Sequence, residues 1–117
     1  MTRTPDPAPY LPLTPAAFHV LIALADGPKH GYAVMKDVGQ RTGGGVRLST
    51  GTLYGIVKRL LDDELIVELP PSPDDDERRR PYRLTPLGRA VAAAEARRLE
   101  TLVAQARAVR LIGPRTT

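Results

Sequence analysis

The residues best suited to binding chemistry lie together in one stretch of the sequence, residues 49–63. Spaced as on a helix, they divide into an apolar arc and a polar side. The apolar arc, which we expect to pack into a core, comprises Leu53, Ile56, Val57, Leu60 and Leu61. The polar side has hydroxyls and cations but no acid before Asp62, and comprises Ser49, Thr50, Thr52, Tyr54, Gly55, Lys58 and Arg59.

This polar side has the chemistry of a DNA contact. An α-helix fits the major groove, where hydroxyls and cations reach phosphate oxygens and base edges. Gly55 has no side chain, so the helix backbone there can come close to a groove. We therefore predict that this helix reads duplex DNA. The alternative is an ordinary solvated helix surface.

A second group of cations follows in a predicted β-hairpin. The β-prone run 66–69 and the return at 82–84 flank a polar, turn-rich tip. At the start of the return strand, Arg78, Arg79 and Arg80 are placed to contact the minor groove or the DNA backbone. The acids at 74–77 either keep the tip extended or limit non-specific binding, and a plain solvated loop is the alternative. A helix followed by such a hairpin is typical of a winged helix-turn-helix.

Two shorter helices are predicted before this unit. Thr14 and Pro15 supply a cap and a first helical residue, and apolar side chains continue to about residue 25. Phe18 and Ile22 widen the apolar arc of this helix, which predicts that it is covered on two sides. A second helix is expected from Gly31 to about residue 42. The link 46–48 is extended, with a small first strand as the alternative.

A long helix is predicted from Thr85–Pro86 to about residue 111. Its apolar stripe finds too little neighbouring chain to cover it, so we expect a homodimer, the commonest closed assembly. The predicted dimer interface is Phe18, Ile22, Val91, Leu99, Leu102, Val103, Ala106 and Val109. Glu95 falls inside the stripe, which leaves four alternatives open: a register that opens to water, a solvated gap, an ion pair between subunits, or a ligand contact.

Composition excludes several other classes of protein. The chain has 117 residues, a net charge of +4 and no cysteine, which indicates one small basic domain without disulfides or thiolate chemistry. His19 and His30, the two histidines, have no obvious carboxylate partner, so we expect no metal site. No catalytic group of residues is recognisable, and we expect neither enzymatic activity nor a cofactor. Without an apolar run of about 20 residues or a signal peptide, a cytoplasmic protein is expected.

The predicted fold is mainly α with a small β-hairpin wing. Residues 1–12, with four prolines, form a flexible N-terminal arm. Residues 13–84 form the winged helix-turn-helix domain, 85–112 the C-terminal dimerisation helix, and 113–117 a flexible tail.

The sequence resembles the PadR family of bacterial transcriptional regulators across about residues 13–110. The matching pieces are LTPAAFHVLIALADGPKHGYAVM at 13–35, STGTLYGIVKRLLDDELI at 49–66 and DDERRRPYRLTPLGR at 75–89. The resemblance implies a dimer joined through the first and last helices. It also implies repression at palindromic operators and, often, release from DNA by a small-molecule effector. Its DNA-facing positions fall on Thr50, Thr52, Tyr54, Lys58, Arg79 and Arg80.

Two features depart from the pattern of that family. Pro81 has no N–H where the return strand usually has a donor, so we expect a strand edge there. The single C-terminal helix is short and aromatic residues are few. Both features argue against a large aromatic effector pocket and leave a cavity between subunits as the candidate.

The function expected from the sequence is therefore a homodimeric, sequence-specific regulator of transcription, most simply a repressor. Its two reading helices would enter successive major grooves about 34 Å apart. The alternative is a winged-helix module that docks on another protein. Lys58 and Arg59 argue against it, because a protein-docking helix should be more apolar on its outer side.

Overall fold

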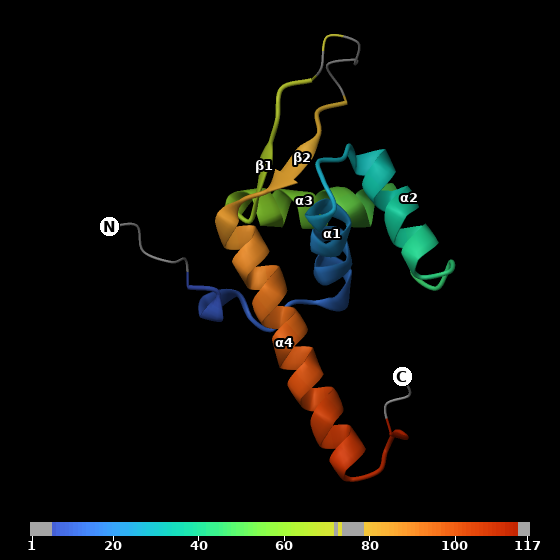
Figure 1. Ribbon diagram of the computed structural model, residues 1–117. Helices are drawn as coiled ribbons and strands as arrows, with labels where there is room; N and C mark the ends of the chain where they lie inside the picture. The colour runs from blue at the N-terminus through green and yellow to red at the C-terminus, as the bar shows by residue number, and fades with distance from the viewer. Residues whose placement is uncertain (1–5, 72, 74–78, 115–117) are drawn as a thin grey trace.

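The computed structural model describes residues 6–71, 73 and 79–114. In order, the chain forms η1 (Ala8–Tyr10), α1 (Pro15–Ala25), α2 (Gly31–Arg41), α3 (Thr50–Asp62), β1 (Ile66–Glu68), β2 (Tyr82–Leu84) and α4 (Pro86–Ala108). Helices α1, α2 and α3 pack together. The hairpin projects from one end of this group, and α4 runs away from it on the other side (Figure 1). This confirms the predicted mainly α fold with a hairpin wing.

Local capping sets where three of the helices begin. The hydroxyls of Thr14, Ser49 and Thr85 accept hydrogen bonds from the backbone three residues on, at 3.1, 3.1 and 2.9 Å. These contacts satisfy amide groups that have no partner inside the helix. All three helix starts agree with the sequence prediction, whereas α4 ends three residues before the predicted 111, at Ala108.

The core lies where α1, α2 and α3 meet the hairpin and the first half of α4. Of the apolar arc predicted for α3, Leu53, Val57 and Leu60 are buried in it, and Ile56 and Leu61 are half-buried against it. The other buried hydrophobic residues are Val20, Leu21, Ala23, Leu24, Val34, Val38, Leu65, Ile66, Leu84 and Val91.

The hairpin is a two-stranded antiparallel sheet in which Val67 is opposite Arg83. Its second strand also pairs on the outer side, because the N–H of Tyr82 donates to the carbonyl of Lys29 at 2.9 Å and the reverse bond is 3.1 Å. Lys29, between α1 and α2, thus provides the additional strand contact that was considered for residues 46–48. Pro81 accepts from the N–H of Leu69 at 2.8 Å just outside β2. The strand edge expected at Pro81 does not extend to Tyr82. Tyr82 is paired with Glu68 on one side and with Lys29 on the other.

Gly88 lets the first turn of α4 lie against the chain entering β1. A Cβ atom there would be 1.8 Å from the carbonyl oxygen of Leu65, which is backbone and cannot move aside as a side chain can. Nearby, the hydroxyl of Thr85 donates to the carbonyl of Glu64 at 2.6 Å. These contacts fix the direction in which α4 leaves the domain.

The N-terminal segment, residues 8–14, includes residues 8–12 of the arm expected at 1–12. Residues 8–10 form η1, and Tyr10, Leu11 and Leu13 pack against the core. The N–H of Leu13 donates to Oε2 of Glu95 at 2.6 Å, which ties the segment to α4. Pro9 and Pro12 fit this irregular, packed path because the N–H groups that donate along it belong to other residues, Tyr10, Leu11 and Leu13.

Candidate nucleic-acid interface

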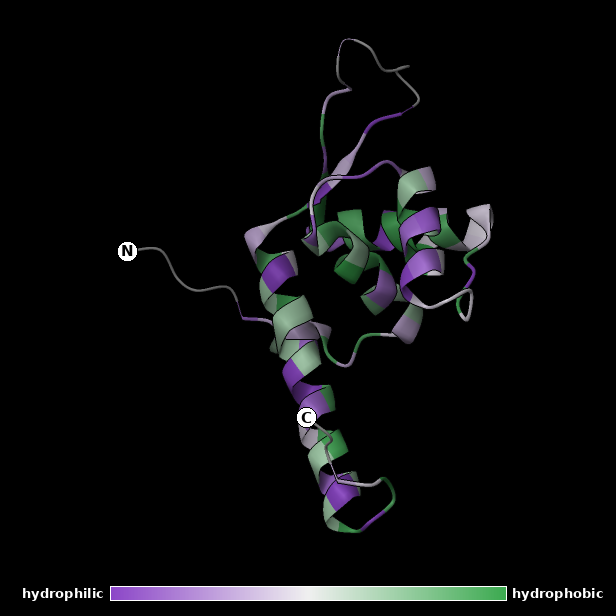
Figure 2. Cartoon of the chain, turned by 45° about the vertical axis from the view of Figure 1, so that its right-hand side comes forward, coloured by the Kyte–Doolittle hydropathy of each residue, from purple (hydrophilic) through white to green (hydrophobic). Residues whose placement is uncertain are grey.

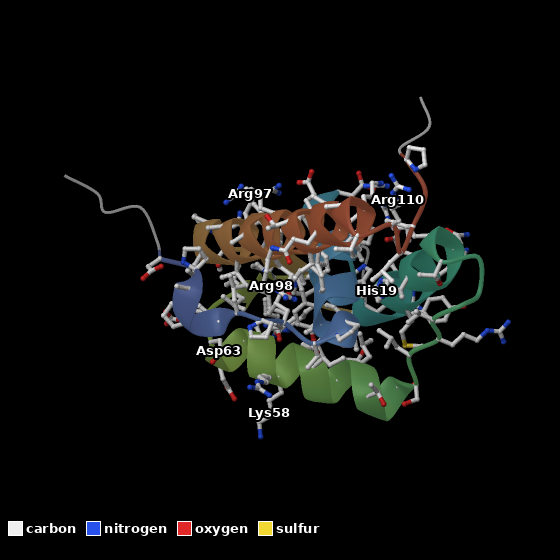
Figure 3. All side chains as sticks on the ribbon, turned by 90° about the horizontal axis from the view of Figure 1, so that it is seen from below. His19, Lys58, Asp63, Arg97, Arg98 and Arg110 are labelled. Carbon is white, nitrogen blue, oxygen red and sulfur yellow. The ribbon has the colours of Figure 1, made fainter. Side chains whose placement is uncertain are left out.

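The polar side of α3 faces away from the core. Ser49, Thr50, Thr52, Tyr54, Gly55, Lys58 and Arg59 are all exposed. Lys58 points away from the remaining helices (Figure 3). Within the part of the chain that the structure describes, neither Lys58 nor Arg59 makes an ion pair. Their charges are therefore free to meet an anionic partner.

The first turn of α3 is shaped by its own side chains. The hydroxyl of Ser49 donates to Oγ1 of Thr52 at 2.9 Å and also caps the helix. Tyr54 is 46% exposed, but its hydroxyl lies against the start of α2, where a Cβ atom on Gly31 would be 2.7 Å from it. Tyr54 therefore links the two helices of the helix-turn-helix as well as lying on the polar side.

Arg59 and Gly55 face the N-terminal segment as well as solvent. Both line a groove of about 680 Å³ between α3 and the N-terminal segment, together with Tyr10, Leu11 and Asp63. In Figure 3, Asp63 lies at the end of α3 that is next to this segment. The predicted DNA-contacting side of α3 and the groove thus share residues.

The wing carries the remaining predicted cations. Arg79 and Arg80 are exposed, and Nε of Arg80 lies 3.5 Å from Oε1 of Glu68 on the neighbouring strand. This ion pair was not foreseen, because it depends on the strand register. Arg78 and the acids at 74–77 lie outside the described residues.

Two further cations were not predicted as site residues. Arg47 precedes α3 and Arg83 is on β2; both are exposed and neither has an ion pair within the described residues. Strand alternation contains a signal for Arg83, because its neighbour Leu84 is buried and adjacent strand residues face opposite ways. No comparable pattern distinguishes Arg47 in the sequence.

The residues predicted for the dimer interface differ in how far they are exposed. Leu99, Leu102, Val103 and Val109 are exposed, while Phe18, Ile22 and Ala106 are half-buried. Val91 differs from the prediction, because it is 0% exposed inside the core of its own chain and has no surface left for a partner. The first half of α4 belongs to the domain, and the exposed apolar residues of the helix, Leu99, Leu102 and Val103, lie in its second half. Figure 2 shows hydrophobic (green) and hydrophilic (purple) residues alternating along α4.

Glu95 is also inside the domain. Its side chain is buried, accepts from the N–H of Leu13 and forms a short ion pair with Arg98 one turn later. Arg98 points from α4 toward the other helices, and Arg97 points away from them (Figure 3). The hydrogen bond from Arg98 lowers the pKa of Glu95, burial opposes this, and the Leu13 bond lowers it further. None of the four explanations considered for Glu95 included this contact within one chain.

No group of three metal-ligating side chains occurs among the described residues. Over the same residues, no helix is long and apolar enough to cross a membrane.

A winged helix-turn-helix with a polar, cationic third helix defines a class of transcriptional regulators. The family model of the Transcriptional regulator PadR-like family matches residues 20–94, and the chain belongs to that family. The chain is 38% identical over 84 residues to Transcriptional regulator Rv3488 of Mycobacterium tuberculosis, an alignment that covers 72% of this chain and 75% of that protein.

A second relative is much longer. The chain is 42% identical over 83 residues to an uncharacterized 37.1 kDa protein in transposon TN4556 from Streptomyces fradiae. The alignment covers 71% of this chain but only 22% of that protein, so the chain spans about a fifth of the relative's length.

Solved structures have the same fold. A PadR family transcription regulator from Clostridium difficile matches with a TM-score of 0.68 at 20% identity, covering 80% of this chain and 95% of that one. BpsR from Bordetella bronchiseptica, whose DNA binding is regulated by 6-hydroxynicotinic acid, matches with a TM-score of 0.63 at 28% identity. That match covers 80% of this chain and 64% of BpsR.

Proposed function

We propose that this chain is a homodimeric regulator that binds duplex DNA, with α3 of each subunit in a major groove. The observation that carries the proposal is the division of α3 into a buried apolar arc and an exposed side with two cations that have no ion pair in the described chain. Within the described chain, the two cations of this side, Lys58 and Arg59, have no anionic partner. A phosphate backbone neutralises them.

The residues divide into two roles. Lys58, Arg59 and the wing arginines Arg79 and Arg80 neutralise phosphates, which gives affinity. Ser49, Thr50, Thr52 and Tyr54 set the geometry of the first turn or contact base edges, which gives sequence preference. Gly55 lets the helix backbone approach the groove.

The second half of α4 supports the dimer. Leu99, Leu102 and Val103 are exposed in a helix that extends from the domain without a covering element (Figure 1). The radius of gyration is 16.1 Å, above the ~13 Å expected of a compact chain of about this length. A second copy that buries this stripe and the half-buried Phe18 and Ile22 is the simplest cover.

Twofold symmetry has a consequence for the DNA. Two copies of α3 related by a dimer axis read two inverted half-sites, so the operator should be palindromic, with half-sites about 34 Å apart. Occupying such a site at a promoter blocks transcription, and we therefore propose repression. Regulation of BpsR by a small molecule supports effector control here as well.

The test is a titration of a labelled random duplex of about 30 base pairs with the full chain, followed by selection of a preferred sequence. We expect binding at low salt that weakens as salt rises, because counterions are released from phosphates. Lys58→Ala should reduce the salt slope by about 1. Arg97→Ala removes the same charge from an exposed site on α4 and is the matched control. No binding at low salt would leave a protein-docking module as the better explanation.

A further inference from the structure

The groove between the N-terminal segment and α3 has the dimensions of a ligand site. Its volume, about 680 Å³, lies within the roughly 300–1,000 Å³ typical of small-molecule pockets. Leu11, Leu13 and Ile56 contribute apolar side chains to a lining that is polar in part, and Arg59 and Asp63 add one charge of each sign. Apolar side chains together with a few placed polar or charged groups are the usual components of such sites.

The two charges lie close together without neutralising each other. Arg59 and Asp63 are four residues apart along α3 and its C-terminal cap, which brings their Cβ atoms to about 5–6 Å on one side of a helix. No ion pair joins them within the described chain, although each lines the groove. A guanidinium accepts a carboxylate, and a carboxylate accepts an ammonium, by charge-assisted hydrogen bonds. A ligand that contacts both side chains therefore needs a negative group for Arg59 and a positive group for Asp63, only a few atoms apart.

We infer that this groove binds a small zwitterion with an apolar body, the chemistry of an apolar α-amino acid. Its carboxylate meets Arg59, its ammonium meets Asp63, and its side chain lies on the surface formed by Leu11, Leu13 and Ile56. The α-carboxylate and α-ammonium of an amino acid are separated by one carbon atom, so the molecule presents both charges together.

The wall of the groove is fastened to α4. The carboxylate of Glu95 holds the N–H of Leu13 at 2.6 Å, and Leu13 lines the groove. The wall is therefore positioned before a ligand arrives, and little conformational freedom is lost on binding.

Occupation of the groove has a consequence for DNA binding, and this step rests on the proposed function. Arg59 and Gly55 line the groove and also belong to the side of α3 proposed to contact DNA. A carboxylate bound to Arg59 takes a cation from the phosphates and adds bulk beside Gly55. The zwitterion therefore weakens DNA binding.

Isothermal titration calorimetry of the full chain tests the site directly. The probes are L-leucine, L-valine, L-methionine and L-phenylalanine, with two analogues of leucine that lack one charge: 4-methylpentanoate has no ammonium and 3-methylbutylamine has no carboxylate. We expect at least one amino acid to bind, and the leucine analogues to bind about tenfold more weakly than leucine, since each lacks a charge-assisted hydrogen bond. If none of the amino acids binds, or if 4-methylpentanoate matches leucine, the inference is overturned.

Substitutions locate the ligand within the chain. Arg59→Ala and Asp63→Asn should each weaken amino-acid binding about tenfold. Asp62→Asn, an exposed acid one residue away that does not line the groove, should leave it unchanged. Equal effects of Asp62→Asn and Asp63→Asn would overturn the assignment.

Measuring DNA binding separately, without amino acid, distinguishes the two proposals. A chain that binds DNA but none of the four amino acids keeps its proposed function and loses this site. A chain that binds an amino acid but no DNA keeps the site and loses the proposed function.

Discussion

At the scale of single residues, Glu95 joins parts of the chain that lie 82 positions apart. A buried carboxylate is unfavourable unless it is paired and hydrogen-bonded, and Glu95 has both an arginine partner and a backbone donor. This residue interrupts the apolar stripe of α4 because two donors, Arg98 and the N–H of Leu13, meet its carboxylate inside the domain. The interruption also marks where α4 stops contributing to the core and begins to project from it.

Removing the Glu95 carboxylate should destabilise the chain. Glu95→Ala leaves the N–H of Leu13 without its acceptor, and we expect a loss of about 1–3 kcal/mol in the free energy of unfolding at pH 7. Urea denaturation measures this. Arg97→Ala, at an exposed neighbouring position, should change stability by less than about 0.5 kcal/mol.

The difference in stability between the wild type and Glu95→Ala should depend on pH. The folded pKa of Glu95 is lower than its ordinary value, so the carboxylate stabilises the fold above the unfolded pKa of about 4.3, and this contribution is lost as pH falls through the folded pKa. The stability difference between wild type and Glu95→Ala should therefore shrink below pH ~4. A difference that grew in acid would contradict the ion pair.

At the scale of elements, α3 and the wing divide the proposed DNA contact between them. Helix α3 has a fixed shape set by its buried arc and its Ser49 cap. The wing is a short hairpin whose second strand is also paired with Lys29. The pairing anchors the base of the hairpin to the helical domain, which places its arginines relative to α3.

The two wing arginines should differ in their effect on DNA binding. Arg79 is unpaired within the described residues, whereas Arg80 is partly neutralised by Glu68. Arg79→Ala should weaken binding to every sequence and reduce the salt slope by about 1, and Arg80→Ala should have a smaller effect. Fluorescence anisotropy at several salt concentrations measures both slopes. An unchanged slope in the double variant would reject the contact of the wing with DNA.

At the scale of the whole molecule, the chain has a domain at one end and an uncovered helix at the other. The first half of α4 is packed through Gly88, Val91 and Glu95, and the second half is exposed. The first half of α4 therefore belongs to the core of the domain, and the second half is available to contact another subunit. In the proposed dimer, the second half fixes the spacing between the two copies of α3, and thus the spacing of the half-sites.

A charge placed in the exposed stripe should separate the subunits. Leu102 is 47% exposed, so Leu102→Asp leaves the folded domain intact but puts a carboxylate in the proposed interface, where burial of an unpaired charge is costly. Sedimentation of the variant should show a monomer. Its binding to DNA should also be weaker than that of the wild type. Ala104→Asp, on the opposite side of α4, is the matched control and should remain a dimer. A dimeric Leu102→Asp variant would place the interface elsewhere.

The sequence alone predicted the four α-helices, the hairpin and the outer side of α3. Caps such as Thr14 and Ser49 and the apolar spacing of α3 act over a few residues, so their effects can be recognised without knowing the fold. Family membership, now shown by the match over residues 20–94, was likewise recognisable from contiguous motifs.

Only the tertiary structure decided where α4 stops being core and what Glu95 binds. Val91 was placed at a dimer interface because periodicity shows that a helix face is apolar but not which partner covers it. The packed path of residues 8–14, the pairing of Lys29 with Tyr82 and the groove beside Arg59 all join segments far apart in the sequence. Such contacts depend on how elements meet in space, and no local pattern of residues specifies that meeting.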